Sequence, residues 1–373
     1  MKIKKILYSF FIVIIFSLDL FGLEAVNPEV RVGLMQNVKT FSVSAKQRFW
    51  IVDSKGQKIT YSKNSNIKFS FSNNVAVGAK KAMSLPLTIV SKGDISINGK
   101  YYHGSFEILR AKSGVTVVNI IDLEEYVKGV VPKEAMPNWK LEALKTQAVI
   151  SRSWAIANLD KHKNDGFDIC ADPHCQVYGG ADVETPNTDE AVKQTRGQVL
   201  IFDGKIANAY YFSNSGGFTE DPNYVWGHTK TPPYLKAKKD PYSKNEPNFN
   251  WEFSIGMDAL RNKFNLGKIS SIKPQGKTAS GAPREIVIKH SKGTKTITPV
   301  QLRTTLGQTK IKSAFITSIQ QSGTNFIFKG NGFGHRVGLS QWGAKAMAEL
   351  GKNYKSILHF YYPGTKIEQL KYE

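Results

Sequence analysis

The residues best suited to chemistry lie between Val127 and Pro137, where Glu134 is a lone carboxylate among apolar residues and two prolines. A carboxyl group that is partly removed from water has a raised pKa and can keep a proton to donate near neutral pH. Protonation of a leaving oxygen is a step that cleavage of a glycosidic bond requires. The same pattern also suits a solvated loop acid beside Lys133, so the local sequence leaves both interpretations open.

A second polar set lies in the glycine-rich run from Gly330 to Ala344, which contains His335 and Gln341. This run lacks the G-x-G-x-x-G spacing of a dinucleotide site. Its glycines would instead leave room for a ligand or for another stretch of backbone, to which His335 and Gln341 offer polar groups. A core histidine satisfied by backbone carbonyls is an equally good interpretation of His335.

Cys170 and Cys175 are the two cysteines of the chain. They could form a disulfide that closes a small loop, or remain free thiols, or hold a structural zinc ion. For zinc, His162 is the better-placed third ligand, because His174 directly precedes Cys175 and simultaneous ligation by neighbours is expected to be awkward. The sequence leaves these three states open.

Two helical patterns flank Glu134. Asp122 and the capping pattern that follows it predict a short helix through Val130. Apolar and small residues at three- and four-residue steps predict a longer helix from Trp139 to about Asp160, capped by Asn138. Glu134 is therefore expected in an elbow between two helices.

The remaining chain predicts an α+β fold with a β-rich N-terminal region and a mixed helix and strand core that contains an α/β insertion. Alternating apolar and polar residues between turn residues predict the N-terminal strands. A strand from Asn325 to Lys329 and a helix from Ser340 to Leu350 are expected after the insertion. The predicted division is a leader at 1–23, the β-rich region at 24–113, the core at 114–253, the insertion at 254–324 and the C-terminal part of the core at 325–373.

The N-terminus and the charge suggest where the protein works. Residues 1–23 combine an early lysine cluster with a short apolar run, which predicts a secretory signal, with a retained anchor as the alternative. The formal net charge is +21. For an exported protein this charge points to anionic wall glycans or phosphates, and no nucleic-acid-binding motif is present.

Several motifs together resemble the SpoIID/LytB family, the stage II sporulation protein D type proteins of the bacterial cell wall. They occur in the family's order between about Val115 and Pro363. The motifs are 125–137 (EYVKGVVPKEAMP), 143–155 (ALKTQAVISRSWA), 213–220 (SNSGGFTE), 225–227 (VWG), 233–236 (PYLK) and 332–344 (GFGHRVGLSQWGA). Arg336 and Leu339 depart from the pattern, because glycine and methionine are common at these positions.

The resemblance implies a lytic transglycosylase that cuts peptidoglycan glycan strands, preferably strands without stem peptides, with Glu134 as the single catalytic acid/base. No cofactor is required for this chemistry, although a structural zinc ion is possible at the cysteine loop. The implied substrate-binding residues are Arg152, Ser213, Ser215, Tyr234, Lys236, His335 and Gln341.

In the expected mechanism, Glu134 protonates the glycosidic oxygen and then takes the proton of the same sugar's 6-hydroxyl, which closes a 1,6-anhydro ring. A hydrolase would need a second carboxylate. The candidates for that carboxylate are Asp122, Glu124, Glu125, Glu220 and Asp221. The rival function is a non-catalytic wall-binding protein that enhances a separate amidase, in which case an amidase or a membrane-anchored wall protein is a partner.

Overall fold

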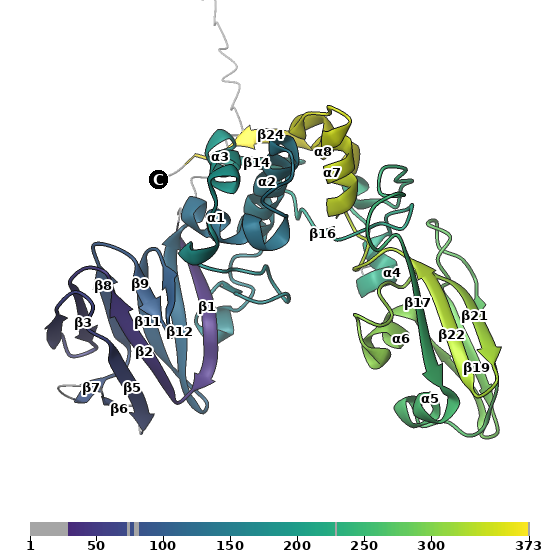
Figure 1. The fold of residues 1–373 in the computed structure, drawn as a ribbon, viewed down its shortest axis with the longest axis horizontal. Coiled ribbons are helices and arrows are strands. Elements are labelled where there is room, and N and C mark those ends of the chain that lie inside the picture. The colour runs from purple at the N-terminus through teal and green to yellow at the C-terminus, as the bar shows by residue number, and fades with distance from the viewer. Residues whose placement is uncertain (1–28, 73–74, 78–81, 228–229, 372–373) are drawn as a thin grey trace, which may run out of the picture.

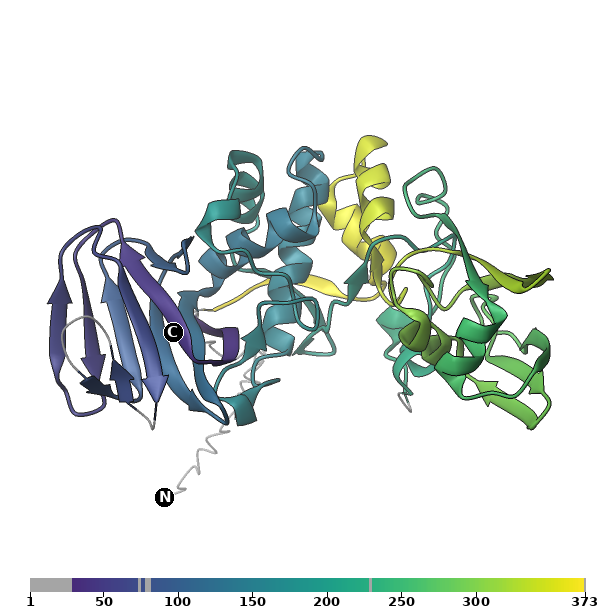
Figure 2. The ribbon, with the colours of Figure 1, turned by 60° about the horizontal axis from the view of Figure 1, so that its bottom comes forward.

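The computed structural model describes residues 29–72, 75–77, 82–227 and 230–371. The predicted leader at 1–23 lies outside these residues. A β-rich region, a group of helices and a second β-containing region follow one another from end to end of the molecule (Figure 1), and the turned view keeps the same order (Figure 2). The predicted α+β class is confirmed. None of the helices within the described ranges combines the length and the apolar character that crossing a bilayer requires.

The N-terminal region consists of two facing sheets. Their strand orders are β13-β1-β12-β11-β8-β3-β4 and β10-β9-β2-β5-β6-β7. Successive side chains of a strand point to opposite faces of its sheet, which explains how the two sheets pack. In β3, Phe49 and Ile51 point into the core while Trp50 between them is partly exposed. The strands are β1 (Glu29–Val38), β2 (Thr40–Ala45), β3 (Phe49–Asp53), β4 (Lys58–Tyr61), β5 (Ile67–Ser72), β6 (Val75–Val77), β7 (Ala82–Ser84), β8 (Leu87–Ser91), β9 (Ile95–Ile97), β10 (Lys100–Tyr102), β11 (Ser105–Ala111), β12 (Gly114–Asp122) and β13 (Ile169–Cys170).

This region extends beyond the predicted boundary at residue 113. Strand β12 pairs with both β1 and β11, so residues 114–122 belong to the N-terminal sheet. Strand β13 pairs in parallel with β1, which places the cysteine loop beside the same sheet.

The central part contains five longer helices and two small sheets. The first helix begins after Asp122, whose side chain accepts hydrogen bonds from the backbone N–H groups of Glu124 and Glu125. This helix continues past Val130 to Glu134, with Pro132 in its last turn. The helices are α1 (Leu123–Glu134), α2 (Leu141–Ala157), α3 (Pro186–Gln194), α7 (Gln341–Glu349) and α8 (Tyr354–Tyr361); the strands are β14 (Gln198–Phe202), β15 (Lys205–Ile206), β16 (Tyr211–Phe212), β23 (Leu339–Ser340) and β24 (Lys366–Gln369).

Short elements complete this part, and the elbow after α1 differs in detail from its prediction. Helix α2 begins after Lys140, which makes no side-chain cap, and Asn138 lies before it in a turn closed by a hydrogen bond from Trp139 N to Met136 O. The predicted cap at Asn138 is therefore wrong. The short elements are helix α4 (Pro222–Trp226) and the 3₁₀ turns η1 (Lys163–Asp165), η2 (Ala181–Val183) and η3 (Pro233–Leu235).

The insertion forms its own core. Its two sheets have the orders β17-β22-β21 and β18-β19-β20, and buried residues such as Leu260, Ile286 and Phe328 fill the space between the sheets and the helices. Strand β17 pairs with β22 over its whole length, so the insertion spans about residues 250–331 and the predicted limits cut through these strands. Its elements are β17 (Asn250–Gly256), α5 (Met257–Phe264), β18 (Ile269–Gln275), β19 (Glu285–His290), β20 (Gly293–Ile297), α6 (Pro299–Leu306), β21 (Ile316–Ser322) and β22 (Asn325–Asn331).

A buried carboxylate joins the insertion to the core. Glu220 of the core accepts hydrogen bonds from Thr278 Oγ1 (2.9 Å) and Ser280 Oγ (2.5 Å) of the insertion. Arg336 lies 3.9 Å away as its ion-pair partner, and its guanidinium also donates to the carbonyl of Phe218. Both charged side chains are almost completely buried. The backbone of Arg336 has φ = 68°, which agrees with the glycine that the family resemblance expects at this position.

A histidine joins the β-rich region to the core. His103 Nδ1 lies 2.7 Å from Asp94 of the β-rich region, and its Nε2 lies 2.9 Å from Glu184 of the core. The hydrogen bond to Glu184, with the charge of the nearby carboxylates, raises the pKa of His103 to about 9, against the opposing effect of burial. The imidazolium therefore links the two regions at neutral pH.

We predict that His103→Gln destabilises the protein at pH 6 by about 1–2 kcal/mol, a value reduced for partial solvent screening, and by almost nothing at pH 10. The pKa in the folded state exceeds the ordinary histidine value of 6.5, so the stabilisation is complete below about 6.5 and is lost as the pH rises through about 9. Urea unfolding of both proteins across this pH range measures the effect. The variant His359→Gln, at an exposed position of α8, serves as the control, and an equal loss at pH 6 and pH 10 contradicts the prediction.

Candidate active site

Glu134 is the last residue of α1, and groups from distant segments surround its side chain. The backbone N–H of Val177 donates to Glu134 Oε1 at 2.9 Å. Burial raises the pKa of Glu134, and the bond from Val177 with the nearby polar groups of Tyr211 and Gln341 only partly opposes this effect. Glu134 can therefore hold a proton closer to neutral pH than a solvated glutamate.

The fold brings Tyr211 and Gln341 together through two parallel strands. Strand β16 starts at Tyr211 and pairs in parallel with β23, which ends one residue before Gln341. Gln341 Nε2 also donates to the main-chain carbonyl of Glu134 at 2.9 Å, which fixes the end of α1 against the start of α7. The glycine-rich segment thus brings the Gln341 side chain to Glu134, and its predicted contact with substrate stays a prediction.

A buried polar chain extends from the site. Gln176 Nε2 donates to the Tyr211 hydroxyl oxygen at 3.1 Å, and the Tyr126 hydroxyl donates to Gln176 Oε1 at 3.1 Å. This chain ends at Tyr211, whose hydroxyl group lies near Glu134. The sequence prediction missed Tyr211 and Gln176, although Tyr211 lies two residues before the 213–220 motif and could have been considered with it. Val177 acts through its backbone, which no residue type identifies.

Arg152 does not reach the site. Its guanidinium is fully buried and donates to both carboxylate oxygens of Glu124, from Nε at 2.8 Å and from Nη2 at 2.7 Å. A third bond goes to the carbonyl of Gln198 at 3.0 Å. Through these bonds Arg152 connects α2 to α1. Its position is that of a structural residue and not of a group that contacts substrate.

Ser213 and Ser215 support loops near the site. The carbonyl of Ser213 accepts the backbone N–H of Trp342 at 3.0 Å, which helps to place the start of α7. Ser215 is buried, and its hydroxyl lies 2.7 Å from that of Ser243. Both residues therefore shape the backbone, and the hydroxyl of Ser215 has its partner within the protein.

The two predicted residues of the 233–236 motif, Tyr234 and Lys236, lie in different surroundings. Tyr234 belongs to a hydrophobic core, and its hydroxyl accepts the backbone N–H of Asn208 at 3.1 Å. Lys236 is exposed at the end of η3. The structure thus leaves Lys236 free to meet a ligand, whereas Tyr234 is engaged in packing.

His335 lies next to the site, because its ring is close to the backbone of Tyr211. Its Nδ1 accepts the backbone N–H of Val337 at 3.1 Å. Burial lowers the pKa of His335 to about 4, and the charge of Arg303 adds to this effect, so the imidazole is neutral at pH 7. The ring lies among three aromatic side chains: Tyr210, Phe212 and Trp226.

The cysteine loop gathers four possible metal ligands. Cys170, Cys175, His162 and His174 each offer an atom, and all four atoms lie within 4.8 Å of one another. His174 Nδ1 is 3.5 Å from Cys170 Sγ and 3.7 Å from Cys175 Sγ. The expectation that His174 is awkwardly placed is therefore wrong, because the turn after Asp172 lets both neighbours point inward. The two cysteines are free thiols in this structure, so the alternative disulfide is not formed.

The five candidates for a second catalytic carboxylate all have other partners. Asp122 caps α1, and Glu124 binds Arg152. Glu125 pairs with Lys128 at 2.7 Å. Glu220 joins the insertion to the core, as described above, and Asp221 accepts the backbone N–H of Ala237 at 2.9 Å.

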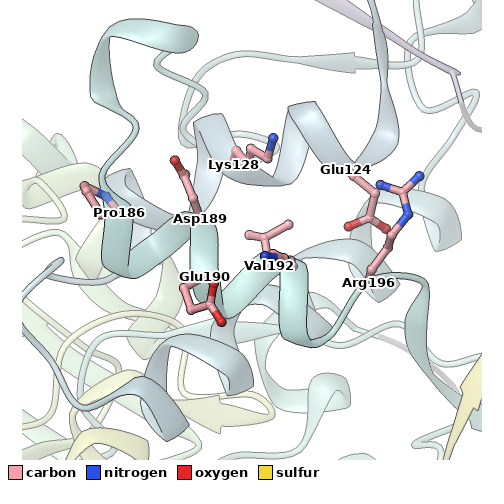
Figure 3. A pocket seen from close by; sticks show the side chains of 8 residues that line it. Glu124, Lys128, Pro186, Asp189, Glu190, Val192 and Arg196 are labelled. Carbon is pink, nitrogen blue, oxygen red and sulfur yellow. The ribbon is translucent and has the colours of Figure 1, made fainter.

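A cavity of about 260 Å³ lies between α1 and α3, apart from Glu134 (Figure 3). Glu124 lines it, ten residues before Glu134, which corresponds to about 15 Å along the helix. Its lining residues are Glu124, Lys128, Pro186, Asp189, Glu190, Val192, Lys193 and Arg196. We therefore place the candidate active site at Glu134, where the polar groups converge, and not at this cavity.

Comparison with known proteins assigns the family. Residues 111–202 match the family described as SpoIID, stage II sporulation protein. Stage II sporulation protein D of Bacillus subtilis (strain 168) is 30% identical over 267 residues, which cover 68% of this chain and 76% of that protein. An uncharacterized protein of Brachyspira hyodysenteriae is 34% identical over 281 residues, which cover 73% of each. The amidase enhancer of Bacillus subtilis (strain 168) is 30% identical over 328 residues, and the match spans only 45% of that longer protein. The chain belongs to the SpoIID/LytB family.

Proposed function

We propose that this protein is a peptidoglycan lytic transglycosylase in which Glu134 is the only catalytic carboxyl group. The observation that carries the proposal is the raised pKa of Glu134, caused by burial, together with its fixed position at the end of α1. A buried carboxyl group with these properties suits general-acid catalysis near neutral pH. Export to the cell envelope is part of the proposal and rests on the predicted leader.

The mechanism needs one group in two roles. Protonated Glu134 donates to the glycosidic oxygen that leaves C1 of muramic acid, and the C1–O bond breaks. The resulting carboxylate then removes the proton of the 6-hydroxyl of the same sugar, whose oxygen bonds to C1 and closes the 1,6-anhydro ring. The backbone N–H of Val177, which donates to Glu134 Oε1, stabilises its carboxylate between these two steps. The other partners of the five alternative carboxylates favour this single-residue mechanism over a hydrolase with two acids.

The products distinguish the possible functions. Incubation of the purified protein with glycan strands that lack stem peptides, followed by mass spectrometry, should reveal 1,6-anhydromuramic ends. New reducing ends would instead indicate a hydrolase. Intact strands together with faster cleavage by an added amidase would favour the alternative function of amidase enhancer, which the name of one relative suggests.

The proposal includes a structural zinc ion at the cysteine loop. Two sulfur and two imidazole donors at these mutual distances fit the tetrahedral coordination that zinc adopts in structural sites. Cys170, Cys175, His162 and His174 would hold the ion. Val177 follows Cys175 by two residues, so an ordered loop also positions the N–H group that binds Glu134.

We predict that elemental analysis of protein purified without chelators finds zinc in equal amount to the chain. Removing the ion with a chelator should lower the Tm by about 5–10 °C, because the loop loses the free energy of metal binding. Glycan cleavage should decline as the N–H donor of Val177 loses its place. Added zinc should restore both properties, and a Tm that chelation leaves unchanged would exclude a structural ion.

A further inference from the structure

The positive charge of the chain is concentrated in the insertion. Residues 250–331 contain thirteen Lys and Arg residues and three Asp and Glu residues, a net charge of +10. The other 291 residues contain 38 Lys and Arg residues and 27 Asp and Glu residues, a net charge of only +11. A lysine-rich composition alone would spread the excess evenly over the chain. The insertion therefore has its own electrostatic character.

Part of this charge lies on the small sheet of the insertion formed by β18, β19 and β20. Its inward face carries Ile286 and Ile288, which are completely buried. Lys273 of β18 is paired with Val287, and Lys289 lies two positions further along the neighbouring strand, on the same exposed face. Residues in this diagonal arrangement are about 7–8 Å apart.

Two further lysines lie at the end of the sheet next to Lys289. The backbone N–H of Ser291 donates to the carbonyl of Lys268 at 2.9 Å, and Lys292 follows in the same turn. Both lysines are exposed. We call Lys268, Lys273, Lys289 and Lys292 together the basic sheet face.

No carboxylate forms an ion pair with these four lysines among the residues that the structure describes. Of the three acidic residues in the insertion, Glu252 pairs with Lys329 and Asp258 pairs with Arg261. Glu285 lies at the other end of β19, opposite Gln275. The charges of the basic sheet face are therefore not neutralised by close partners, and they attract anions from solution.

The other side chains of this sheet indicate the kind of anion. Ser271 and Thr294 lie opposite Lys289 on its two neighbouring strands, so a residue with a hydroxyl group flanks this lysine on each side. The three strands contain no Phe, Tyr or Trp, which single-stranded nucleic acids use for stacking. Ammonium and hydroxyl donors without aromatic rings suit a polyhydroxylated polymer that carries carboxylates.

We propose that the basic sheet face binds the peptidoglycan glycan strand through the lactyl carboxylates of its muramic acid residues. The inference rests on the proposed function, because it names a second binding surface for the same substrate. The surface lies in the insertion, whereas Glu134 lies in the core, so it holds the strand without taking part in the bond cleavage. A strand held at the insertion stays near Glu134 between successive cuts.

The test compares two variants of equal charge. In the first, Lys268, Lys273, Lys289 and Lys292 are all replaced by Gln. In the control, four exposed lysines of the β-rich region are replaced by Gln: Lys39, Lys63, Lys68 and Lys92. Binding of both to glycan strands without stem peptides is measured at several salt concentrations. We expect the first variant to bind roughly tenfold more weakly at low salt, with a shallower dependence on salt, and the control to change less than about twofold. Equal weakening of both variants would overturn the proposal.

Modified polymers and a short substrate complete the test. Strands whose carboxylates have been converted to amides should bind the unmodified protein and the first variant equally weakly, and equal binding of amidated and native strands would overturn the proposal. Stronger binding of the basic sheet face to double-stranded DNA or to anionic vesicles would also overturn it. The first variant should cleave a soluble tetrasaccharide at the normal rate. Absence of cleavage by the unmodified protein, with carboxylate-dependent binding intact, would refute the proposed enzyme function and leave this inference standing.

Discussion

Glu134→Gln is expected to lower the rate of glycan cleavage by a factor of about 10² to 10⁴, the range for loss of a general acid. Glutamine keeps the size of the side chain and can still accept the N–H of Val177, but it has no proton to transfer to the leaving oxygen. The rate of release of 1,6-anhydromuramic ends measures the effect. Thermal unfolding should show that the variant is folded, because its main-chain bond to Gln341 remains.

The pH dependence provides the second part of this test. Since burial raises the pKa of Glu134, the unmodified enzyme should lose activity as the pH rises through that pKa and the acid is deprotonated. The residual activity of Glu134→Gln should lack this decline. Glu349→Gln, at an exposed carboxylate near the end of α7, is the matched control and should cleave normally. Normal cleavage by Glu134→Gln would refute the mechanism.

Arg152→Met should destabilise the protein by about 3–5 kcal/mol, because it leaves the Glu124 carboxylate buried without its charged partner. Urea unfolding measures this loss. The double variant Glu124→Gln with Arg152→Met should recover part of it, since no unpaired charge remains. The exposed pair of Lys329 and Glu252 is the control, and its Lys329→Met variant should lose less than about 1 kcal/mol.

This prediction also separates a structural role of Arg152 from the substrate contact that the family resemblance implies. A structural role predicts that Arg152→Met binds glycan normally under conditions in which it is fully folded. Unchanged stability together with a large loss of glycan binding would show that Arg152 acts on the substrate, contrary to its position between α1 and α2.

Regular patterns in the sequence predicted the two helices next to the site. Asp122 as a helix cap and the apolar spacing after Trp139 indicated both helices, but Glu134 was placed between them, whereas it is the last residue of α1. The insertion was recognised from its change of composition, but its limits were wrong because β17 and β22 pair across residues distant in sequence. Local patterns do not contain such pairings.

The surroundings of Glu134 could be predicted only in part. Gln341 was singled out as a polar side chain in the glycine-rich run; it lies at Glu134 and binds its main-chain carbonyl, while its contact with substrate stays a prediction. Val177 could not be found, since any residue except proline supplies a backbone N–H group. His174 was discounted by reasoning about neighbours in sequence, whereas a tight turn places both neighbours on one side. Tyr234 and Ser215 belong to recognisable motifs, but their hydroxyl groups are satisfied inside the protein.

The carboxylate of Glu220 has a practical consequence for anyone who shortens this chain. Excising the insertion would remove the hydroxyl donors of Thr278 and Ser280 and leave Glu220 with Arg336, 3.9 Å away, as its ion-pair partner. Arg336 precedes Gln341 by five residues, so a disturbed guanidinium would affect the segment whose Gln341 binds the main-chain carbonyl of Glu134, the proposed catalytic acid. A minimal catalytic fragment should therefore either retain the loop around residues 278–280 or replace both charged residues together.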